Sequence, residues 1–463
     1  MSGTVTLILP IWLRDKLEAA AAADVETGFV LLASVTERAG PVRLLARELH
    51  PVPDSGYVSR EGDGMTVTPT GYLAALARAA ELGAAALWVH THPGPGSTPL
   101  PSLKDVEVDR QLADTFRIRT GQPWYGAVVF AVGEQGRLAF SGHLQREDDE
   151  PLAVGRLWAV GDRLSLTTAF GVGKKRPLQM WDRNVRAFGA DLQRALGELR
   201  VTIVGCGGTG SAVAEQVTRL GVRHLHLIDP DRLSDSNLTR VYGSAPGDIG
   251  RPKADVLAAH VRHIAPDAYV TTAAAMLTTQ PVASHATASD VIFGCTDDNA
   301  GRLVLSRLAT YYMTPVFDCG VLISSTGDGK ITGVDGRVTV MTPGQGCLVC
   351  RDRVDLRRAA SELMTPAERN RLAAEGYAPG LPGIEPAVVA YTSLVAALAV
   401  SELLERMIGY GPDLVPGEIL ARCHERELSA NIAAPRPGHY CDPAAGQLGR
   451  GDIEPFLGQT WPA

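Results

Sequence analysis

The sequence contains no apolar run long enough to cross a membrane and no surplus of positive charge. A membrane-spanning helix needs roughly 20 consecutive apolar residues, and polar residues interrupt every apolar run well before that length. The N-terminus lacks the basic stretch and small-residue cleavage site of a secretory signal. The formal net charge is −7, whereas nucleic-acid binding normally needs a clustered basic surface. We therefore expect a cytoplasmic protein that binds neither membranes nor nucleic acid.

Cysteine is sparse, and the sequence shows no internal repeat or long low-complexity tract. The seven cysteines are an odd number scattered through 463 residues. This pattern is typical of a reducing compartment, because disulfide-stabilised proteins are short and rich in cysteine. The chain is instead long, with 45% hydrophobic and 21% charged residues, which is enough for two or three domains with buried cores.

The expected elements divide the chain into two α/β domains, residues 1–144 and 179–463, joined by a linker at 145–178. In the first domain the apolar patterns predict two helices and three strands, at 12–23, 72–82, 28–34, 42–50 and 85–90. In the second domain, strand-like runs alternate with helical stretches such as 211–220. That alternation predicts a parallel, doubly wound sheet of the dinucleotide-binding type.

A glycine-rich turn joins the first predicted strand of the second domain to a helix. An apolar run leads directly into Gly205, Gly207, Gly208 and Gly210, after which an amphipathic helix begins. Glycines at such a turn let the backbone approach a phosphate, and the free N–H groups at the start of the helix bind its negative charge. A close crossing of a helix over a strand also needs glycines, so packing is the alternative.

The acids after the next strand leave the nucleotide open, and the residues downstream decide it. The strand ends in Asp229-Pro-Asp231, and Asp229 stands where a dinucleotide-binding domain holds a ribose hydroxyl, which both NAD and ATP provide. Asn237, Arg240 and Lys253 follow. Transfer of adenylate builds charge on the α-phosphate and on the departing pyrophosphate, so it needs a cationic pair that a nicotinamide enzyme does not. The sequence therefore predicts ATP and an adenylation reaction.

These motifs, with Asp297 at the end of a later strand, resemble the ThiF/MoeB/ubiquitin-activating superfamily in order and approximate spacing. The resemblance covers about residue 181 to the C-terminus. It implies a Rossmann-like domain that adenylates a carboxylate with ATP and Mg²⁺, the ion for which carboxylates are suitable ligands. It assigns the ribose to Asp229, the phosphates to Asn237, Arg240 and Lys253, and the magnesium ion to Asp297.

An arginine before the glycine turn is the sequence feature that suggests a second subunit. Residues Trp181–Arg186 resemble the segment of that superfamily whose arginine reaches the ATP of the neighbouring subunit in a dimer. The resemblance implies this role for Arg183 and a homodimer. A solvated charge on a surface helix is the alternative.

Two cysteines in C-x-x-C spacing form half of a tetrahedral zinc site. They are Cys347 and Cys350. The superfamily resemblance implies a second C-x-x-C near the C-terminus, and the nearest equivalents in this sequence are His439-Tyr-Cys441 and, earlier, Cys423-His424. The first pair is our candidate, together with Cys347 and Cys350. We expect these four side chains to bind Zn²⁺. The alternative is reduced thiols and an imidazole without metal.

The resemblance to ubiquitin-activating enzymes also implies a thioester cysteine in the crossover segment, here residues 351–387, but that segment contains no cysteine. Cys206 and Cys295 are interpreted as packing residues, which leaves Cys319 as the remaining candidate nucleophile. We therefore expect the acyl-adenylate to pass directly to a partner's thiol or to a sulfur donor.

The first domain contains its own candidate metal site. His90 and His92 end a predicted strand, and residues two apart on a strand point to one face. Asp105 could supply a third ligand and leave a position open for water, as in catalytic zinc sites, with Glu26 as the base. The alternative is that Ser102 and the acid three residues after it only form a helix N-cap, and that the histidines are simply polar surface residues.

Glu26, His90-x-His92-Pro and Ser102-x-x-Asp105 resemble the JAB/JAMM metallopeptidases, over about residues 4–144. The resemblance implies a bound Zn²⁺, cleavage after ubiquitin-like C-termini, Glu26 as general base and Ser102 as support for the oxyanion. The sequence departs from that pattern in the longer separation of Ser102 from His92.

Together the two domains predict a bifunctional, bacterial-type enzyme that processes a ubiquitin-like protein and adenylates its C-terminal glycine for conjugation, with a conjugating enzyme as a further partner. A second hypothesis replaces conjugation with sulfur transfer, so that a sulfur-carrier protein receives a thiocarboxylate from a sulfur donor. In a third, the first domain has lost catalysis and only binds the modifier.

Overall fold

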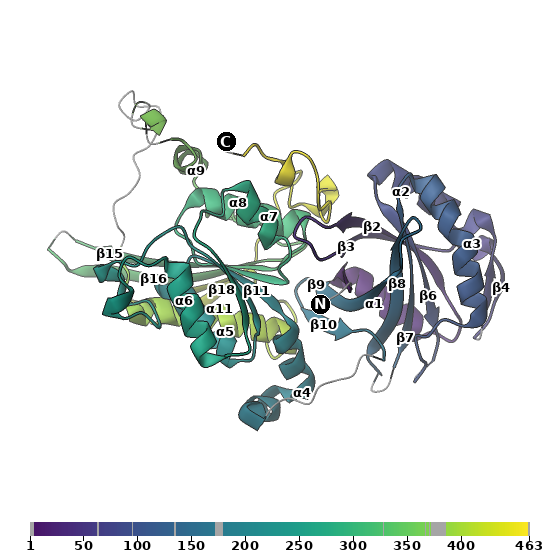
Figure 1. Ribbon diagram of the computed structural model, residues 1–463, viewed down its shortest axis with the longest axis horizontal. Helices are drawn as coiled ribbons and strands as arrows, with labels where there is room; N and C mark the ends of the chain where they lie inside the picture. The colour runs from purple at the N-terminus through teal and green to yellow at the C-terminus, as the bar shows by residue number, and fades with distance from the viewer. Residues whose placement is uncertain are drawn as a thin grey trace. The chain divides into compact units, whose positions relative to one another are not determined.

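The computed structural model describes residues 4–62, 64–94, 96–133, 136–171, 179–326, 328–365, 367–369, 371 and 386–461. The chain forms two compact units (Figure 1). The first comprises Met1–Lys174 with Gly449–Ile453, and the second comprises Lys175–Leu448 with Glu454–Ala463. No described helix is both long and apolar enough to span a bilayer.

The first unit is built on an eight-stranded sheet in the order β1-β3-β2-β6-β7-β8-β9-β10. Because β1 pairs with β9 as well as with β3, the strands from β1 to β9 close into a ring. A separate hairpin is formed by β4 (Tyr57–Arg60) and β5 (Met65–Val67). The strands of the main sheet are β1 (Val5–Pro10), β2 (Gly28–Thr36), β3 (Arg43–Pro51), β6 (Ala85–His92), β7 (Trp124–Val132), β8 (Leu138–Arg146), β9 (Leu152–Val160) and β10 (Ser165–Thr168).

Helices cover both faces of this sheet. α1 (Ile11–Ala21) buries its leucines in one core cluster, while α2 (Leu73–Leu82) and α3 (Leu103–Thr120) pack into a second cluster on the other face. α2 ends at Gly83, whose left-handed conformation stops the helix just before β6. α3 also packs against β6.

The linker expected at 145–178 differs from the structure. The acidic cluster at 147–150 forms the turn between β8 and β9, with Glu147 at a positive φ of 47°. Both β9 and β10 belong to the first sheet, where β9 pairs with β1, and the side chains at 157–160 are buried. The acidic turn therefore does not mark a domain boundary. Residues 172–178 lie outside the described residues.

The second unit contains a sheet in the order β13-β12-β11-β14-β15-β16-β17-β18. The five strands from β13 to β15 run parallel, and β16, β17 and β18 continue antiparallel. The strands are β11 (Arg200–Val204), β12 (His224–Ile228), β13 (Tyr269–Ala273), β14 (Val291–Gly294), β15 (Val316–Ser325), β16 (Ile331–Met341), β17 (Glu418–Arg422) and β18 (Glu427–Asn431). This sheet agrees with the predicted Rossmann-like fold.

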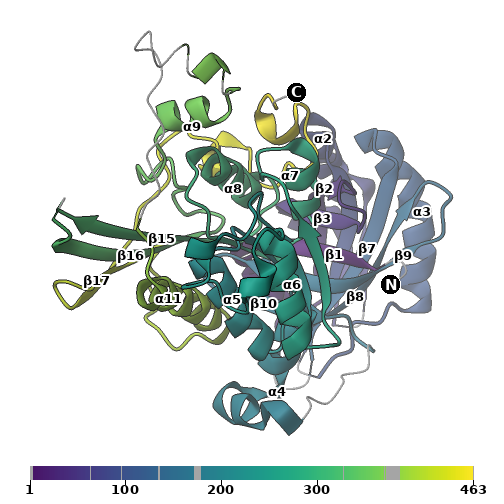
Figure 2. The same ribbon diagram turned by 60° about the vertical axis from the view of Figure 1, so that its left-hand side comes forward.

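The helices of the second unit connect and cover these strands. The central parallel strands β11 and β14 are buried on both faces, as a covered sheet requires. α11 packs against α5 and against β15 and β16, and the long β15–β16 hairpin extends beyond it (Figure 2). The helices are α4 (Asp182–Glu198), α5 (Gly208–Arg219), α6 (Lys253–Ile264), α7 (Gln280–Ala286), α8 (Asn299–Tyr311), α9 (Leu356–Glu362) and α11 (Val389–Ile408).

Candidate active sites

The glycine turn of the second unit combines tight packing with one open position. Gly205 has a φ of +90°, and a side chain there would lie 2.5 Å from the carbonyl oxygen of Cys295. A side chain at Gly210 would overlap the carbonyl oxygen of Gly205, so packing accounts for both glycines. At Gly207, by contrast, a side chain would meet no other atom. This residue is the N-cap of α5, which begins at Gly208, and backbone N–H groups at such a position bind anions.

Asp229, at the end of β12, is fixed against the glycine turn. Its Oδ2 accepts a hydrogen bond from the backbone N–H of Cys206 at 2.6 Å, and its Oδ1 accepts one from the N–H of Asp231 at 2.8 Å. Burial raises the pKa of Asp229, and each carboxylate oxygen keeps a lone pair for a further donor. The Asp231 carboxylate in turn lies 2.8 Å from the Lys253 ammonium. Asp231 thus links Asp229, the predicted ribose ligand, to Lys253, a predicted phosphate ligand, through a backbone hydrogen bond and an ion pair.

Internal hydrogen bonds fix the turn that carries Asn237 and Arg240. Asn237 is buried, and its Oδ1 accepts a hydrogen bond from the N–H of Ser234 at 3.0 Å. Because the turn uses the amide oxygen, the Nδ2 group is the part of this side chain that can donate to a ligand. Arg240 Nη1 donates to the carbonyl oxygen of Ser236 at 2.8 Å, and a guanidinium has further donors for a phosphate.

The two adjacent acids at the end of β14 differ in their contacts. Asp298 is the N-cap of α8, where its carboxylate accepts hydrogen bonds from the N–H of Gly301 and from the hydroxyl of Thr296. The Asp297 carboxylate is exposed, and none of the described residues forms a hydrogen bond or ion pair with it. Asp297 is therefore the acid that can bind a metal ion without disrupting the helix cap.

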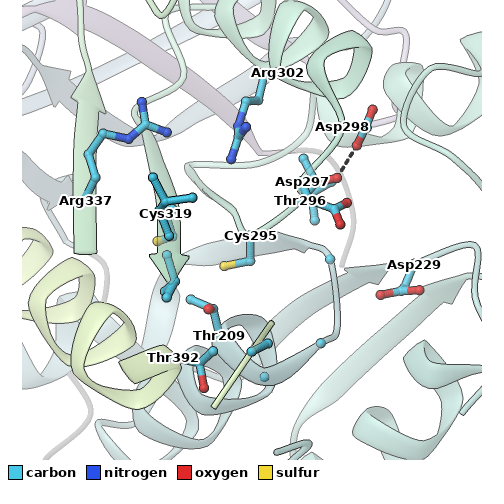
Figure 3. Close-up of a pocket in the computed structure, with 18 of the residues that line it drawn as sticks. Thr209, Asp229, Cys295, Thr296, Asp297, Asp298, Arg302, Cys319, Arg337 and Thr392 are labelled. Carbon is cyan, nitrogen blue, oxygen red and sulfur yellow. Dashed lines mark hydrogen bonds between the residues drawn. The ribbon is translucent and has the colours of Figure 1, made fainter. Parts of the chain in front are cut away.

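A pocket of about 1290 Å³ brings most of the predicted nucleotide-binding residues together (Figure 3). Two lie elsewhere: Gly210 is packed inside the turn, and Arg183 is exposed on α4 and is not part of the pocket lining. The predicted residues in the lining are Gly205, Gly207, Gly208, Asp229, Asp231, Asn237, Arg240, Lys253 and Asp297.

The pocket continues to a charged group that the sequence patterns did not reveal. Arg302 of α8 and Arg337 of β16 both line the pocket and form ion pairs with Asp318 of β15, which is completely buried. Arg302 lies in the first turns of the helix after Asp297, so its closeness to Asp297 in the sequence could have identified it as a pocket residue. Asp318 and Arg337 meet only through the pairing of β15 with β16, so no local spacing reveals them.

Cys295 and Cys319 line the pocket, but neither they nor Cys206 is arranged as an activated nucleophile. A hydrogen bond to Cys319, together with burial, raises the pKa of the Cys295 thiol well above its usual range. Burial and the nearby Asp229 carboxylate do the same for Cys206. Cys319 is itself buried, whereas reactive thiols are accessible and have a lowered pKa. Of the expected crossover segment, residues 372–385 lie outside the described residues.

A second cluster in this unit joins the four predicted zinc ligands, Cys347, Cys350, His439 and Cys441. His439 Nδ1 lies 3.2 Å from Cys441 Sγ and 3.4 Å from Cys350 Sγ. The sulfurs of Cys350 and Cys441 are 3.5 Å apart. Ligands at about 2.0–2.3 Å from a tetrahedral zinc are separated by roughly 3.3–3.8 Å. The donor set and its spacing therefore fit a structural zinc ion.

The first unit gathers a separate cluster at the end of β6. The Oδ2 of Asp105, in the first turn of α3, lies 3.7 Å from His90 Nε2 and 3.8 Å from His92 Nε2. Both ring nitrogens of His90 are buried, and no described residue forms a hydrogen bond with either. Buried polar atoms normally have a partner. These nitrogens and the His-His-Asp donor set fit a zinc ion with an open coordination position.

Glu26 lies beside this cluster, just before β2. Its Oε1 is 4.0 Å from His92 Nε2, and 10% of its side chain is exposed. Burial raises the pKa of Glu26, although the two histidines partly oppose this shift. A raised pKa suits a carboxylate that must accept a proton and return it near neutral pH.

Ser102 begins α3 through a capping box. Its Oγ accepts a hydrogen bond from the N–H of Asp105 at 3.2 Å, and its own N–H donates to Asp105 Oδ2 at 2.7 Å. The N-cap alternative is thus realised, and the same bonds hold the Asp105 carboxylate beside the histidines. Within the described chain the Ser102 hydroxyl contacts neither His90 nor Glu26, so its role at an oxyanion stays a prediction.

Comparison with known proteins identifies relatives of the second unit. The ThiF family matches residues 181–435 of the chain. The chain is 31% identical over 172 residues to the molybdopterin-synthase adenylyltransferase of Escherichia coli (strain K12), covering 37% of this chain and 65% of that protein.

Two further relatives are similar to the chain over a comparable length. The SAMP-activating enzyme E1 of Haloferax volcanii is 29% identical over 162 residues, 35% of this chain and 56% of that protein. The sulfur carrier protein ThiS adenylyltransferase of Escherichia coli (strain K12) is 32% identical over 162 residues, 35% of this chain and 61% of that protein. The chain thus spans less than two thirds of the length of each of these three relatives.

Proposed function

The chain belongs to the ThiF family, and from this membership we propose that its second unit adenylates the C-terminal carboxylate of a ubiquitin-like or sulfur-carrier protein with ATP. The observation that carries the proposal is the pocket in which Gly207, Arg240, Lys253 and Asp297 meet. The names of the relatives support the substrate class, because they describe adenylyltransferases or an activating enzyme for molybdopterin synthase, ThiS and SAMP.

In this reaction an oxygen of the carrier's terminal carboxylate attacks the α-phosphorus of ATP. A new P–O bond forms, and pyrophosphate leaves with the electron pair of the bond that breaks. Negative charge grows on the phosphate oxygens, where Arg240 and Lys253 stabilise it. The open backbone at Gly207 binds a phosphate through N–H groups, and Asp229 accepts a ribose hydroxyl.

The Asp297 carboxylate is the group that would hold Mg²⁺. When bound, this ion neutralises the charge of the phosphate oxygens and orients them. The carboxylate fits that role because no helix cap or ion pair among the described residues occupies it. Asp298 cannot exchange with it, since the N-terminus of α8 depends on Asp298.

The product passes directly to an external sulfur in this proposal. A thioester on this chain is disfavoured because the pKa of Cys295 is raised, first by its hydrogen bond to Cys319, and because Cys319 is buried. Activation of a sulfur carrier, whose acyl-adenylate receives sulfur from a donor, needs no such cysteine. The relatives named for molybdopterin synthase and ThiS favour this route over conjugation.

The zinc cluster holds together two segments that are far apart in the sequence. Cys347 and Cys350 follow β16, whereas His439 and Cys441 follow β18. We assign Zn²⁺ to these four ligands as a structural ion. Such an ion contributes to folding and leaves no open position for chemistry.

Pyrophosphate release tests the adenylation proposal. The full chain is incubated with ATP, Mg²⁺ and purified ThiS-type and ubiquitin-like carriers that end in a free glycine carboxylate. We expect pyrophosphate release, and exchange of labelled pyrophosphate into ATP, with at least one carrier and not with its C-terminal amide. Asp297→Asn should abolish both signals, while Asp413→Asn, an exposed acid outside the pocket, should leave them unchanged. The absence of any signal across the carrier panel would contradict the proposal.

We propose a second function, hydrolysis of the peptide or isopeptide bond after such a carrier's C-terminus, for the first unit. The observation that favours it is the group of His90, His92 and Asp105 beside a Glu26 whose pKa burial raises. A bound zinc would lower the pKa of a water molecule and polarise the scissile carbonyl.

The residues of the chain supply the remaining steps. His90, His92 and Asp105 would hold the ion, and the capping box at Ser102 keeps the Asp105 carboxylate in place. Glu26 takes the proton of the attacking water and returns it to the departing amine, which balances the hydrolysis. Release of a free C-terminal glycine would expose the carboxylate that the second unit adenylates.

Cleavage of a carrier extended beyond its terminal glycine tests this function. We expect a free carrier and the released extension, with the activity lost after zinc chelation and restored by added Zn²⁺. If the first unit binds the carrier and zinc but cleaves no extended or isopeptide-linked carrier, it is a binding module and the hydrolase proposal is wrong.

A further inference from the structure

Two arginines in the nucleotide pocket share one buried carboxylate. Asp318 Oδ1 accepts a hydrogen bond from Arg302 Nε at 3.2 Å, and its Oδ2 accepts one from Arg337 Nη2 at 2.6 Å. Both arginines line the pocket, whereas Asp318 is completely buried behind them. Two guanidinium groups share one carboxylate, so this group of three side chains carries one net positive charge.

Arg337 has donors that the protein does not use. On β16 it stands opposite Gly320 of β15, and a side chain at Gly320 would come within 3.2 Å of its Nη2. The glycine therefore gives the guanidinium room across the neighbouring strand. Of its five N–H donors, the described residues accept only the one to Asp318, and Nη1 is buried without a partner. Buried donors normally have partners, and an ordered water molecule or a bound ligand can supply the one that Nη1 lacks among the described residues.

The position of this pair along the pocket indicates which part of the bound molecules it meets. Figure 3 places Arg337 on the far side of the pocket from Asp229, beyond Asp297. Asp229 marks the ribose end, and Asp297 with Lys253 marks the phosphates. In-line attack brings the carboxylate to the α-phosphorus from the side opposite the departing pyrophosphate. A cation that binds this carboxylate must therefore stand apart from Arg240 and Lys253, which serve the triphosphate, and Arg337 does so because it comes from β16 on the other side of Asp297.

We propose that Arg337 is a specificity-determining residue that binds the terminal carboxylate of the acyl substrate, an assignment that rests on the adenylation function proposed above. Its guanidinium donates to the carboxylate oxygen that does not attack ATP. The other oxygen forms the bond to the α-phosphorus as pyrophosphate leaves, so the oxygen held by Arg337 becomes the carbonyl oxygen of the acyl-adenylate. Asp318 and Arg302 position the guanidinium for both states.

This assignment makes a free carboxylate the recognised feature of the substrate. A guanidinium binds a carboxylate through charge-assisted hydrogen bonds, which are roughly twice as strong as neutral ones. A C-terminal amide would lose the charge and would place an N–H group against another donor. The pocket should therefore reject amidated or extended carriers before any chemistry takes place.

A pair of stable nucleotides tests the assignment without knowledge of the natural carrier. The probes are 5′-O-[N-(acetylglycyl)sulfamoyl]adenosine, which mimics the acyl-adenylate of a C-terminal glycine, and 5′-O-sulfamoyladenosine, which lacks the acyl group. The dissociation constants of both are measured by calorimetry for the full chain and its variants. We expect Arg337→Gln to weaken the acylated probe by about tenfold or more, as loss of a charge-assisted hydrogen bond does, and to leave the other probe unchanged.

Two further variants separate recognition from folding. Arg337→Gln leaves the buried Asp318 with one partner fewer, so the double variant Asp318→Asn/Arg337→Gln removes both charges together. It should fold and still lose the preference for the acylated probe. Arg357→Gln, an exposed arginine of α9 outside the pocket lining, is the matched control and should keep that preference.

The outcomes distinguish this inference from the function on which it rests. If neither probe binds the wild-type chain, the adenylation proposal fails. If both bind and Arg337→Gln changes their affinities equally or not at all, adenylation stands and the role of Arg337 is wrong. Selective loss of the acylated probe in both Arg337 variants, with Arg357→Gln unchanged, supports the assignment.

Discussion

The Nδ1 atom of His92 lies 2.8 Å from the backbone carbonyl oxygen of Thr98. Because a carbonyl can only accept, Nδ1 must carry the proton of the neutral ring. The Nε2 atom, which faces Asp105 at 3.8 Å, is then left unprotonated. Metal-binding histidines are commonly oriented by such a bond from the other ring nitrogen. The loop after β6 therefore sets His92 in the tautomer that binds a metal.

The number of zinc ions bound per molecule should show separately whether each of the two clusters binds zinc. We expect the purified full chain to hold about two zinc ions per molecule, one in each unit. His90→Ala removes a ligand from the first cluster only, so its zinc content should fall to about one while pyrophosphate release stays unchanged. Elemental analysis after gel filtration measures this. His143→Ala, a β8 variant outside the cluster, should keep both ions, and a His90→Ala protein that also keeps both would contradict the assignment.

Glu26→Gln should separate metal binding from catalysis in the first unit. The amide has nearly the same size but cannot accept the proton, so cleavage of an extended carrier should fall by roughly 10²–10⁴-fold. Zinc content should not change, because Glu26 is not among the grouped ligands. Glu81→Gln, an exposed acid of α2, provides the control. Equal loss of zinc and activity in Glu26→Gln would show a structural role instead.

Most of the predicted nucleotide-binding residues share one pocket because their positions depend on local sequence. The glycine turn, Asp229 and Asp297 each follow the end of a buried parallel strand, and such ends meet at one edge of a sheet. The same logic applies to His90 and His92, which are two residues apart on one strand. In these cases a spacing along the chain specifies a position in space.

The contacts that the sequence did not predict depend on how strands pair with one another. Asp318 and Arg337 come together because Gly320 pairs with Arg337 across the β15–β16 hairpin, and register of this kind follows from packing over the whole sheet. The expected linker failed for a related reason. The acidic residues at 147–150 lie in a turn, and the strand after them belongs to the first sheet because it pairs with β1, which lies about 150 residues earlier in the chain.

Cys350→Ser should destabilise the second unit by removing a zinc ligand. Zinc binding to a structural site contributes directly to folding, so a loss of about 2 kcal/mol would lower the unfolding midpoint by roughly 4–8 °C for a unit of this size. Differential scanning calorimetry with and without added zinc measures the shift. Cys423→Ser changes a free cysteine outside the cluster and is the matched control. The prediction is wrong if both variants unfold at the wild-type temperature with full zinc content.

Lys253→Ala should slow adenylation without unfolding the pocket. The ammonium lies 2.8 Å from Asp231 and 13% of the side chain is exposed, so it is held at the pocket wall and can reach a phosphate. Loss of one such transition-state contact lowers kcat by roughly 10²–10³-fold. Exchange of labelled pyrophosphate into ATP measures the change. Lys330→Ala, in the exposed turn between β15 and β16, should exchange at the wild-type rate, and comparable loss in both variants would argue against a specific role.

The stability of the second unit should fall in acid because of Glu418 on β17. Burial opposes ionisation of this carboxyl group, but hydrogen bonds from Arg353, Asn431 and Thr339 outweigh it and lower its pKa to about 2. The carboxylate is almost completely buried, and Arg353 Nη2 donates to it at 2.6 Å. Since the pKa in the unfolded chain is near 4.5, the ionised group contributes its full stabilisation above that pH and loses it as the pH falls toward 2.

The size of this effect follows from the pKa difference. About 2.5 units at 1.36 kcal/mol each give roughly 3 kcal/mol of unfolding free energy lost between pH 4.5 and 2. Glu418→Gln should therefore unfold more easily than the wild type at pH 7 but depend less on pH below 4.5, as urea titrations at several pH values can measure. Glu427→Gln, at the exposed end of the same hairpin, should keep the wild-type pH dependence. Parallel curves for wild type and Glu418→Gln would mean that other carboxylates carry the acid sensitivity.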